Sequence, residues 1–385
     1  MVFGRGRASY GPIAIDLAGH RVKMLQLTPG DGQPALMAWA ELVPPATTPP
    51  TRRDWLREAL GEAVERRGFR GRGVVSSLGP GEFELKNVRL PPMPPEELGA
   101  AVEFEARERF GMTPEQAEFR HLVAGQVRHG NEVREEVIVF AARREVIQER
   151  IALFAEVGLD PIALDIGPCA MARCFVRFLR RAEDAAAVHV FLDVGWRGTS
   201  LCVTRGAEVC FVKLFDIGGS AFTKALATRL ELSEADALRL RVKIVTAAAQ
   251  KQADAGDTPP ELMDSAADAV RPIVEQLARE VHLSLRYFSV TFRGQRPDCL
   301  TFVGGEAHEP TLIPTIANGL EIPCTVGDPL RGVNETESIA ERLARSYRPA
   351  WAVAMGLGLR GLMAEVQHAR TPRPAAVGAA VGAGA

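Results

Sequence analysis

The chain has 385 residues, of which 46% are hydrophobic and 24% are charged, and its formal net charge at pH 7 is only -2. This is the composition of a globular protein, and the near-neutral charge excludes a strongly basic nucleic-acid-binding surface or an acidic tail. Since one hydrophobic core normally serves roughly 100 to 200 residues, at least two lobes are expected.

The sequence contains no pattern typical of membrane insertion or secretion. No apolar run approaches the roughly 20 residues of a membrane-spanning helix. The basic start MVFGRGRASYG is soon followed by Asp16, His20 and Arg21, so it lacks the apolar core of a secretion signal. The six cysteines are scattered without a CxxC pair, which favours buried free thiols over a metal site. We therefore expect a cytoplasmic protein.

Residues 11–82 are predicted to form a first lobe. Three strands, IAID, VKMLQL and ALMAWAEL, are separated by loops, and residues 30–32 supply a hairpin turn. A Pro/Thr-rich connector leads into DWLREALGEAVERRG, whose apolar residues recur at helical spacing until Gly68. The strand GVVSSLG follows. Residues 166–186 and 349–363 are assigned to the same lobe.

Residues 83–165 are predicted to form an inserted α/β subdomain. The strand FELKNVRL and a Pro-rich turn precede an amphipathic helix that ends near Phe110. The strand VIVFAA and the helix EVIQERIALFAEVG complete the unit.

Residues 187–348 are predicted to form a second lobe. Its start, HVFLDVGWRGTSLCVTRGAEVCFVKLF, gives strand, loop, strand, turn and strand. A helical subdomain at residues 220–295 follows, and its last helix carries a long apolar stripe typical of core packing. The strand CLTFVGG, a short helix, a strand near Cys324 and the helix WAVAMGLGLRGLM come next. Residues 364–385 are rich in Ala, Gly and Pro and are predicted to be a disordered tail.

The start of the first lobe recurs at the start of the second. In each, an apolar strand ends in an aspartate, Asp16 or Asp193, and a glycine-containing loop leads into two further strands. Backbone N–H groups of such a loop can contact phosphate oxygens, while the carboxylate orients a hydrated Mg²⁺. A Gly-Gly turn at residues 304–305 opens a helix that could meet a purine or ribose. Together these features predict a nucleotide cleft between two similar lobes.

The order of these segments resembles the superfamily of actin, the heat-shock chaperone ATPases and hexokinase, and most specifically the type IV pilus assembly protein PilM family, over about residues 11 to 361. The resemblance implies an α/β, actin-like (ribonuclease H-like duplicated) two-lobed fold with an inserted small α/β subdomain. The insertion and the IGG-x-x-x-T-x-A-L run favour PilM over FtsA or MreB. The carrying segments are IAIDLAGHRVKMLQL, VRLPPMPPEELGAAVEFEARERFGM, VIVFAARREVIQERIALFAEVGLDPIALD, FLDVG, LFDIGGSAFTKALA, and FVGGEA with IPCTVGDPL.

The resemblance also implies which residues face a nucleotide. Asp16 and Asp193 would hold Mg²⁺ through water, and one glycine pair would form a turn near the nucleotide while another flanks the adenosine. The implied cofactor-binding residues are Asp16, Gly19 and Lys23 in the first phosphate loop, Asp193 and Gly195 in the second, Gly218 and Gly219 in the turn, and Gly304 and Gly305 beside the adenosine.

Five loop residues depart from the family's pattern. Ala18 stands where the first loop usually has glycine, and His20 and Arg21 replace small hydroxyl residues. Trp196 and Arg197 are bulky where the second loop usually has small residues. An indole can fill the space of a phosphate, whereas Arg and His can neutralise phosphate charge. Two alternatives stay open: a cleft that binds ATP and Mg²⁺, and a degenerate cleft that binds neither.

The resemblance implies a cytoplasmic scaffold of the inner-membrane platform of a type IV pilus, or of a related secretion or competence machine, peripheral to the membrane through its partners. The expected partner is the cytoplasmic N-terminal peptide of a PilN-like membrane protein, docked in a groove of the first lobe, with contacts expected at Val88–Phe110. No motif identifies a residue that positions water for hydrolysis, so no catalytic residue is assigned and a scaffold is favoured over a turnover enzyme. An ATP-dependent small-molecule kinase and an FtsA- or MreB-like filament protein remain alternatives.

Overall fold

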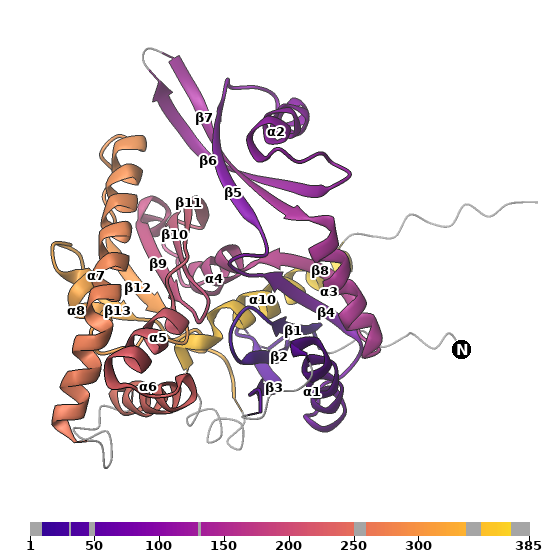
Figure 1. The fold of residues 1–385 in the computed structure, drawn as a ribbon. Coiled ribbons are helices and arrows are strands. Elements are labelled where there is room, and N and C mark those ends of the chain that lie inside the picture. The colour runs from indigo at the N-terminus through magenta and orange to yellow at the C-terminus, as the bar shows by residue number, and fades with distance from the viewer. Residues whose placement is uncertain are drawn as a thin grey trace, which may run out of the picture.

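The computed structural model describes residues 10–30, 32–45, 51–129, 132–249, 259–335 and 348–370. Its framework is a pair of five-stranded sheets, one in each lobe (Figure 1). The first sheet contains, in spatial order, β3 (Ala35–Leu42), β2 (Val22–Thr28), β1 (Ile13–Asp16), β4 (Gly73–Leu78) and β8 (Asp160–Ile166). The second contains β11 (Glu208–Phe215), β10 (Thr199–Arg205), β9 (Val188–Val194), β12 (Cys299–Val303) and β13 (Cys324–Val326).

The two sheets have the same plan. In each, the strand that carries the aspartate at or next to its end pairs antiparallel with the next strand and parallel with a later one: β1 with β2 and β4, and β9 with β10 and β12. The predicted duplication of Asp16 and Asp193 at strand ends is therefore confirmed. Residue 31 of the predicted hairpin turn lies outside the described residues.

Helix α1 (Arg52–Arg66) covers one face of the first sheet. The side chain of Thr51 accepts a hydrogen bond from the Asp54 amide and caps the helix start. Gly68 follows the helix with a φ of +81°, a conformation that glycine adopts without strain. Leu56 and Leu60 are buried against the sheet.

The inserted subdomain is smaller than predicted. It has its own sheet, in the order β5 (Glu84–Leu90), β7 (Glu132–Arg143) and β6 (Ala117–His129), and the helix α2 (Pro95–Phe110). The predicted boundary of 83–165 also included the segment that forms α3 (Arg144–Glu156) and β8. However, β8 pairs with β4 in the first sheet, and α3 packs into the same core as α1. Both therefore belong to the first lobe.

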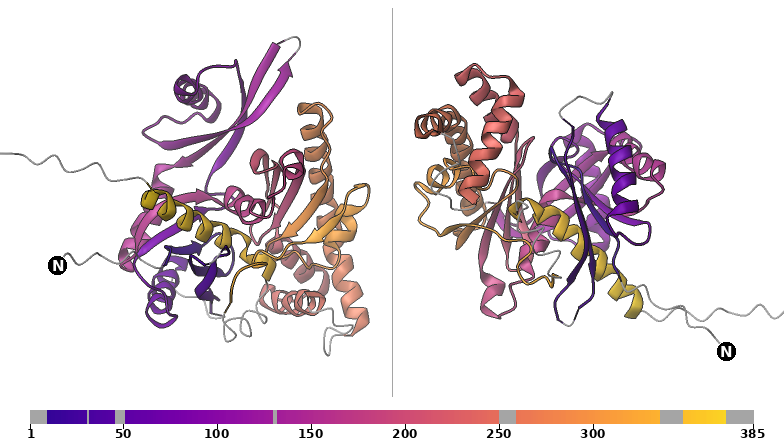
Figure 2. Two further views of the ribbon diagram at one scale, coloured as in Figure 1. Left: turned by 180° about the vertical axis from the view of Figure 1, so that it is seen from behind. Right: turned by 90° about the horizontal axis from the view of Figure 1, so that it is seen from below.

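The insertion sheet is covered on both faces, as the alternation along β7 shows. Val137 and Val139 pack with Val102 of α2, whereas Ile138 and Phe140 join the large core that extends through the second lobe. Figure 2 shows this sheet standing away from the two lobes on one side of the molecule. The insertion is thus joined firmly to the lobes while α2 stays on its outer face.

The helical subdomain packs on the second sheet. It comprises α5 (Gly219–Leu230), α6 (Glu234–Ala249) and α7 (Pro260–Thr291), and the short α8 (Leu312–Ala317) lies against α7. The predicted stripe on α7 is the core face, since Val274, Leu277 and Phe288 are fully buried. Within the described ranges, no helix is long and apolar enough to cross a membrane.

Two helices, α4 (Gly167–Val176) and α10 (Ala352–Arg370), pack together where the lobes meet (Figure 1). The 3-10 turn η1 (Glu183–Ala186) lies between α4 and β9, and the 3-10 turn η2 (Arg348–Trp351) directly precedes α10. α10 also contacts β1 and β2, so it fixes the strand that ends at Asp16. α10 continues to Arg370, inside the predicted tail, and residues 371–385 lie outside the described part of the chain.

The contact between α4 and α10 leaves no room for a side chain at Gly356. A Cβ atom there would lie 1.7 Å from the carbonyl oxygen of Ala170. We expect Gly356→Ala to lower the free energy of unfolding by about 1–3 kcal/mol, because a helix must shift. Gly99→Ala on exposed α2, where no atom lies within 4 Å of the added Cβ, should instead raise it by about 0.5–1 kcal/mol. Urea denaturation of both variants tests this, and equal effects would contradict it.

Candidate functional site

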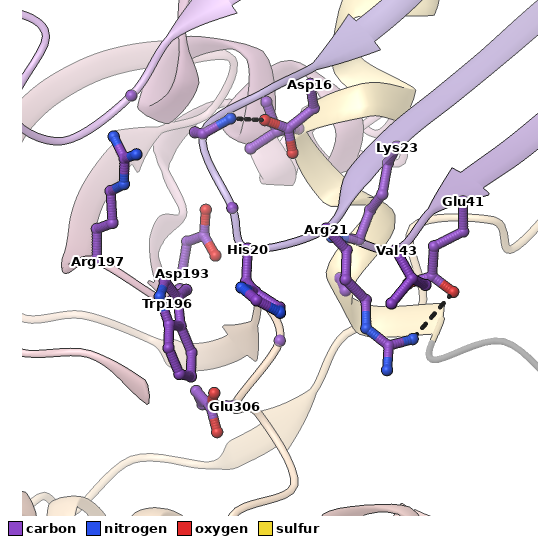
Figure 3. A pocket seen from close by; sticks show the side chains of 18 of the residues that line it. Asp16, His20, Arg21, Lys23, Glu41, Val43, Asp193, Trp196, Arg197 and Glu306 are labelled. Carbon is purple, nitrogen blue, oxygen red and sulfur yellow. Dashed lines mark hydrogen bonds and ion pairs between the residues drawn. The ribbon is translucent and has the colours of Figure 1, made fainter. Parts of the chain in front are cut away.

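A cleft of about 860 Å³ lies between the lobes. Both predicted phosphate loops and the Gly304–Gly305 turn line it, together with residues of α6 and the start of α10. Figure 3 shows side chains from both loops converging on this space. Of the nine residues implied by the resemblance, seven line the cleft, and Gly218 and Gly219 do not.

The first loop is held rigidly by its own carboxylate and by α1. The amide of Ala18 donates to Asp16 Oδ1 at 3.0 Å, and the Arg52 guanidinium donates to the carbonyls of Leu17 and Gly19. The Ala18 methyl group lies against Gly79 of the neighbouring turn. A Cβ atom at Gly79 would lie only 2.4 Å from the Ala18 Cβ, so the absence of a side chain at Gly79 makes room for the methyl group. The alanine is therefore accommodated by Gly79 and does not by itself close the cleft.

Lys23 is the cation best placed to meet an anion in the cleft. It lies opposite Asp16 in the register of β1 and β2, and only 8% of it is exposed. Its ammonium group forms no hydrogen bond or ion pair with any described residue, although burial of a charge without a partner is unfavourable. The carboxylates of Asp16 and Asp193 interact with it electrostatically without a direct ion pair, and a phosphate group would supply a direct partner.

The second loop is built around the start of α5. The Gly195 amide donates to the carbonyl of Gly198, while the carbonyls of Gly195 and Trp196 accept from the amides of Gly219 and Ser220. A Cβ at Gly218 would lie 2.5 Å from the Gly195 carbonyl oxygen. The glycine pair 218–219 thus supports the second loop from behind, and the amides of Gly219 and Ser220 bond the loop instead of facing the cleft.

The two aspartates interact electrostatically across the cleft. The pKa of Asp193 is raised to about 7, chiefly by burial and also by the negative charge of Asp16, against the opposing effect of the Lys23 ammonium. Burial also raises the pKa of Asp16, against the effects of Lys23 and of the Ala18 amide. Strongly shifted pKa values of this kind cluster at functional sites. No group of three or more His, Cys, Asp or Glu side chains that could hold a metal ion is found in the described residues.

His20 and Trp196 meet across the cleft, the first from the first lobe and the second from the second lobe. Their ring centroids lie 5.1 Å apart, and Figure 3 shows the two side chains next to each other. Burial lowers the pKa of His20, and the charges of Arg21, Arg52 and Lys23 lower it further, so the imidazole is neutral at pH 7. Arg21 pairs with Glu41 at 3.4 Å, and Arg197 is exposed.

The Gly-Gly turn lies directly beside Asp193. Gly304 has a φ of +94°, and a Cβ there would lie 2.3 Å from Asp193 Oδ1. At Gly305 an added Cβ would meet no atom within 4 Å, so this residue faces open space. The turn therefore allows close approach of a flat ligand group, which is what an adenosine would need.

A buried charge cluster that has no local signal in the sequence lies behind this turn. Arg241 of α6 is only 3% exposed and forms ion pairs with Glu306 at 2.6 Å and Glu309 at 3.0 Å. It also donates to the Gly219 carbonyl and to the hydroxyl of Thr223. Arg241 and Glu306 line the cleft. The cluster joins α6, α5 and the Gly-Gly turn into one wall.

The sequence model of a family described as type IV pilus assembly protein PilM matches residues 14–362. A PilM-PilN type IV pilus biogenesis complex contains a chain similar to this one, with a TM-score of 0.75 and 24% identity over 92% of this chain and 99% of that chain. The ethanolamine utilization protein EutJ from Carboxydothermus hydrogenoformans has a TM-score of 0.50 and 13% identity, over 92% and 91%. MreB5 of Spiroplasma citri, solved with ADP, has a TM-score of 0.48 and 10% identity, over 96% and 100%. The expected actin-like two-lobed fold is confirmed.

Proposed function

Because the chain belongs to the PilM family of type IV pilus assembly proteins, we propose that it is a scaffold of the pilus assembly platform and binds a short peptide of a PilN-like membrane protein. The observation that carries this proposal is the family match over residues 14–362. The similarity to a chain of the PilM-PilN complex along 92% of this chain supports the choice of partner. Attachment to the membrane would then be indirect, through the partner.

The open sheet edges near the insertion suit an extended peptide. β5 is an edge strand of the insertion sheet and β8 an edge strand of the first sheet. A peptide that adds to such an edge gains backbone hydrogen bonds, while apolar pockets select its side chains. Ile162 on β8 is 57% exposed and Ile151 on the neighbouring α3 is 43% exposed.

Ile162→Asp is expected to weaken binding of the partner peptide by about 10-fold or more, because a charge replaces an apolar contact next to the strand edge. Titration calorimetry of the full chain with a synthetic N-terminal peptide of the PilN-like protein measures this. Leu232→Asp, at an exposed apolar residue of the helical subdomain (37% exposed), is the matched control and should bind normally. Equal affinities of the native chain and the Ile162 variant would mean that the peptide binds elsewhere on the chain. If the native chain does not bind the peptide, the proposed partner is wrong.

We further propose that the cleft binds a nucleotide with Mg²⁺. The volume of the cleft falls within the range of small-molecule sites. The unpaired ammonium of Lys23, the two facing carboxylates and the open side of Gly305 all fit this ligand. The ring contact between His20 and Trp196 would have to rearrange if phosphates pass between the loop tips. The bound metal would neutralise phosphate charge, and the lobes on either side would be drawn together around the ligand.

Lys23→Gln is expected to weaken ATP binding by about 10-fold or more, because the only buried cation of the described cleft without a protein partner is lost. Titration calorimetry with Mg²⁺ and ATP tests this, and Arg197→Gln, at the exposed loop tip, is the control with a smaller expected change. No binding by the native chain would mean that the site is degenerate, without affecting the proposed partner. If the nucleotide closes the lobes, the partner peptide should bind with different affinity when ATP is saturating.

A further inference from the structure

The outer face of α7 carries apolar side chains that nothing in the described chain covers. Leu283 is 60% exposed and Val290 is 76% exposed, and they lie seven residues apart on one side of the helix. Tyr287, 47% exposed, lies beside them. The opposite side of α7 forms the core. This leaves two large apolar groups in line on a long, rigid surface helix.

Arginines surround these apolar residues. Arg279 and Arg286 alternate with Leu283 and Val290 in steps of four, three and four residues, and Arg293 follows the helix end. All three guanidinium groups are exposed and have no ion pair within the described residues. Glu275 and Glu280 lie nearby on the helix, so the face keeps an excess of positive charge. We name this surface, from Arg279 to Arg293, the α7 face.

Helix α2 presents the complementary surface. Phe104 lies at the centre of the outer side of α2 and is 64% exposed. Glu97 lies seven residues before it and Glu108 four residues after it, so both glutamates lie on the same side of the helix. Neither glutamate has an ion pair within the described residues. Glu103 and Glu105 are already paired with Arg107 and Arg109. The α2 face therefore consists of an aromatic ring with acidic groups on both sides.

These two faces cannot meet within one molecule. Figure 1 shows α2 on the insertion and α7 along the far edge of the second lobe, with sheets between them. We propose that the α2 face of one copy docks on the α7 face of a second copy. Phe104 would pack between Leu283 and Val290, while Glu97 and Glu108 approach the arginines. A contact between two different surfaces is head-to-tail, so it generates an open chain or a ring.

The contact is expected to be weak. Two crossed helices bury less than the roughly 1,000 Å² of a stable interface, so dissociation constants of about 10⁻⁵ to 10⁻⁴ M are expected. Opposite charges on the two faces make association depend on ionic strength. This inference goes beyond the proposed partner binding and does not depend on it. A membrane platform that holds many copies side by side would raise the effective concentration.

Sedimentation velocity of the full chain at up to about 200 µM and about 50 mM salt tests the proposal. The native chain should form oligomers that dissociate at high salt. E97R/E108R and R279E/R286E should each weaken association by about 10-fold or more, and the quadruple charge swap should restore it. The control pair E62R/R66E on exposed α1 should leave it unchanged.

Mixing the two charge-reversed variants separates this geometry from other contacts. Each variant keeps one native face, and its reversed face is complementary in charge to the reversed face of the other, so an equimolar mixture should restore the oligomers that neither variant forms alone. A monomeric native chain under all these conditions, or oligomers that withstand both reversals, would overturn the proposal. If the native chain stays monomeric while R279E/R286E abolishes binding to vesicles of anionic phospholipid, the α7 face meets a membrane surface and the proposal is equally wrong.

Discussion

Arg241→Ala is expected to lower the free energy of unfolding by about 3–5 kcal/mol. The guanidinium is buried with the carboxylates of Glu306 and Glu309, and removing it leaves two acids close together without a cation. The hydrogen bonds to the Gly219 carbonyl and to Thr223 are lost as well. Urea denaturation at neutral pH, followed by far-ultraviolet circular dichroism, measures the change.

Two further variants separate the lost charge from the lost packing. Glu309→Gln removes one of the two carboxylates while Arg241 keeps Glu306, so it should cost much less than Arg241→Ala. The triple change R241M/E306L/E309L replaces the whole cluster by apolar side chains and should recover most of the stability. If the triple variant is as unstable as Arg241→Ala, the packing around Phe222, whose ring lies 5.1 Å from the guanidinium carbon, carries the effect instead.

The parts of the fold that the sequence predicted are those with a local pattern that repeats. Asp16 ends one apolar strand and Asp193 lies next to the end of another, and each is followed by a glycine loop and an antiparallel pair. Two occurrences of one pattern identify a duplication even without knowledge of the contacts. The family predicted from these segments is confirmed, and both aspartates line one cleft.

Strand β6 was not predicted because its alternation of apolar and polar residues is interrupted. The register with β7 shifts between Val123 and Gly125, where Gly125 has a φ of +130°. Val123 before the bulge is exposed, whereas Ala124 in the bulge and Val127 beyond it are buried. A one-residue shift moves every later side chain to the opposite face. The sequence of β6 therefore shows no continuous period of two.

The other differences depend on contacts between distant residues. α3 and β8 read as a continuation of the insertion, yet β8 pairs with β4, which precedes the insertion. Arg241 occupies a helix in which a charged residue normally faces water, but its partner Glu306 is 65 residues further along the chain. His20 and Trp196 likewise come together only when the lobes are placed. Local patterns do not specify such pairings.

Asp193→Asn is expected to stabilise the fold at pH 8 by about 2–4 kcal/mol. Burial and the charge of Asp16 raise the pKa of Asp193 from 3.8 to about 7. A carboxyl group whose pKa is raised in the folded chain stabilises the fold when protonated, fully below pH 3.8, and this contribution is lost as the pH rises to about 7. Asparagine stays neutral, so its advantage should grow with pH and level off above about 7.

The comparison with pH 5 makes this result specific. The gain in stability over the native chain should be about 2 kcal/mol larger at pH 8 than at pH 5 in urea denaturation. The same variant should bind ATP with Mg²⁺ more weakly if the cleft is a nucleotide site, because the carboxylate that would orient the hydrated metal is lost. If replacing a residue stabilises the fold and weakens ligand binding, the residue serves ligand binding at a cost to stability. If Asp193→Asn destabilises the chain equally at both pH values, the carboxylate instead contributes to folding through its local contacts.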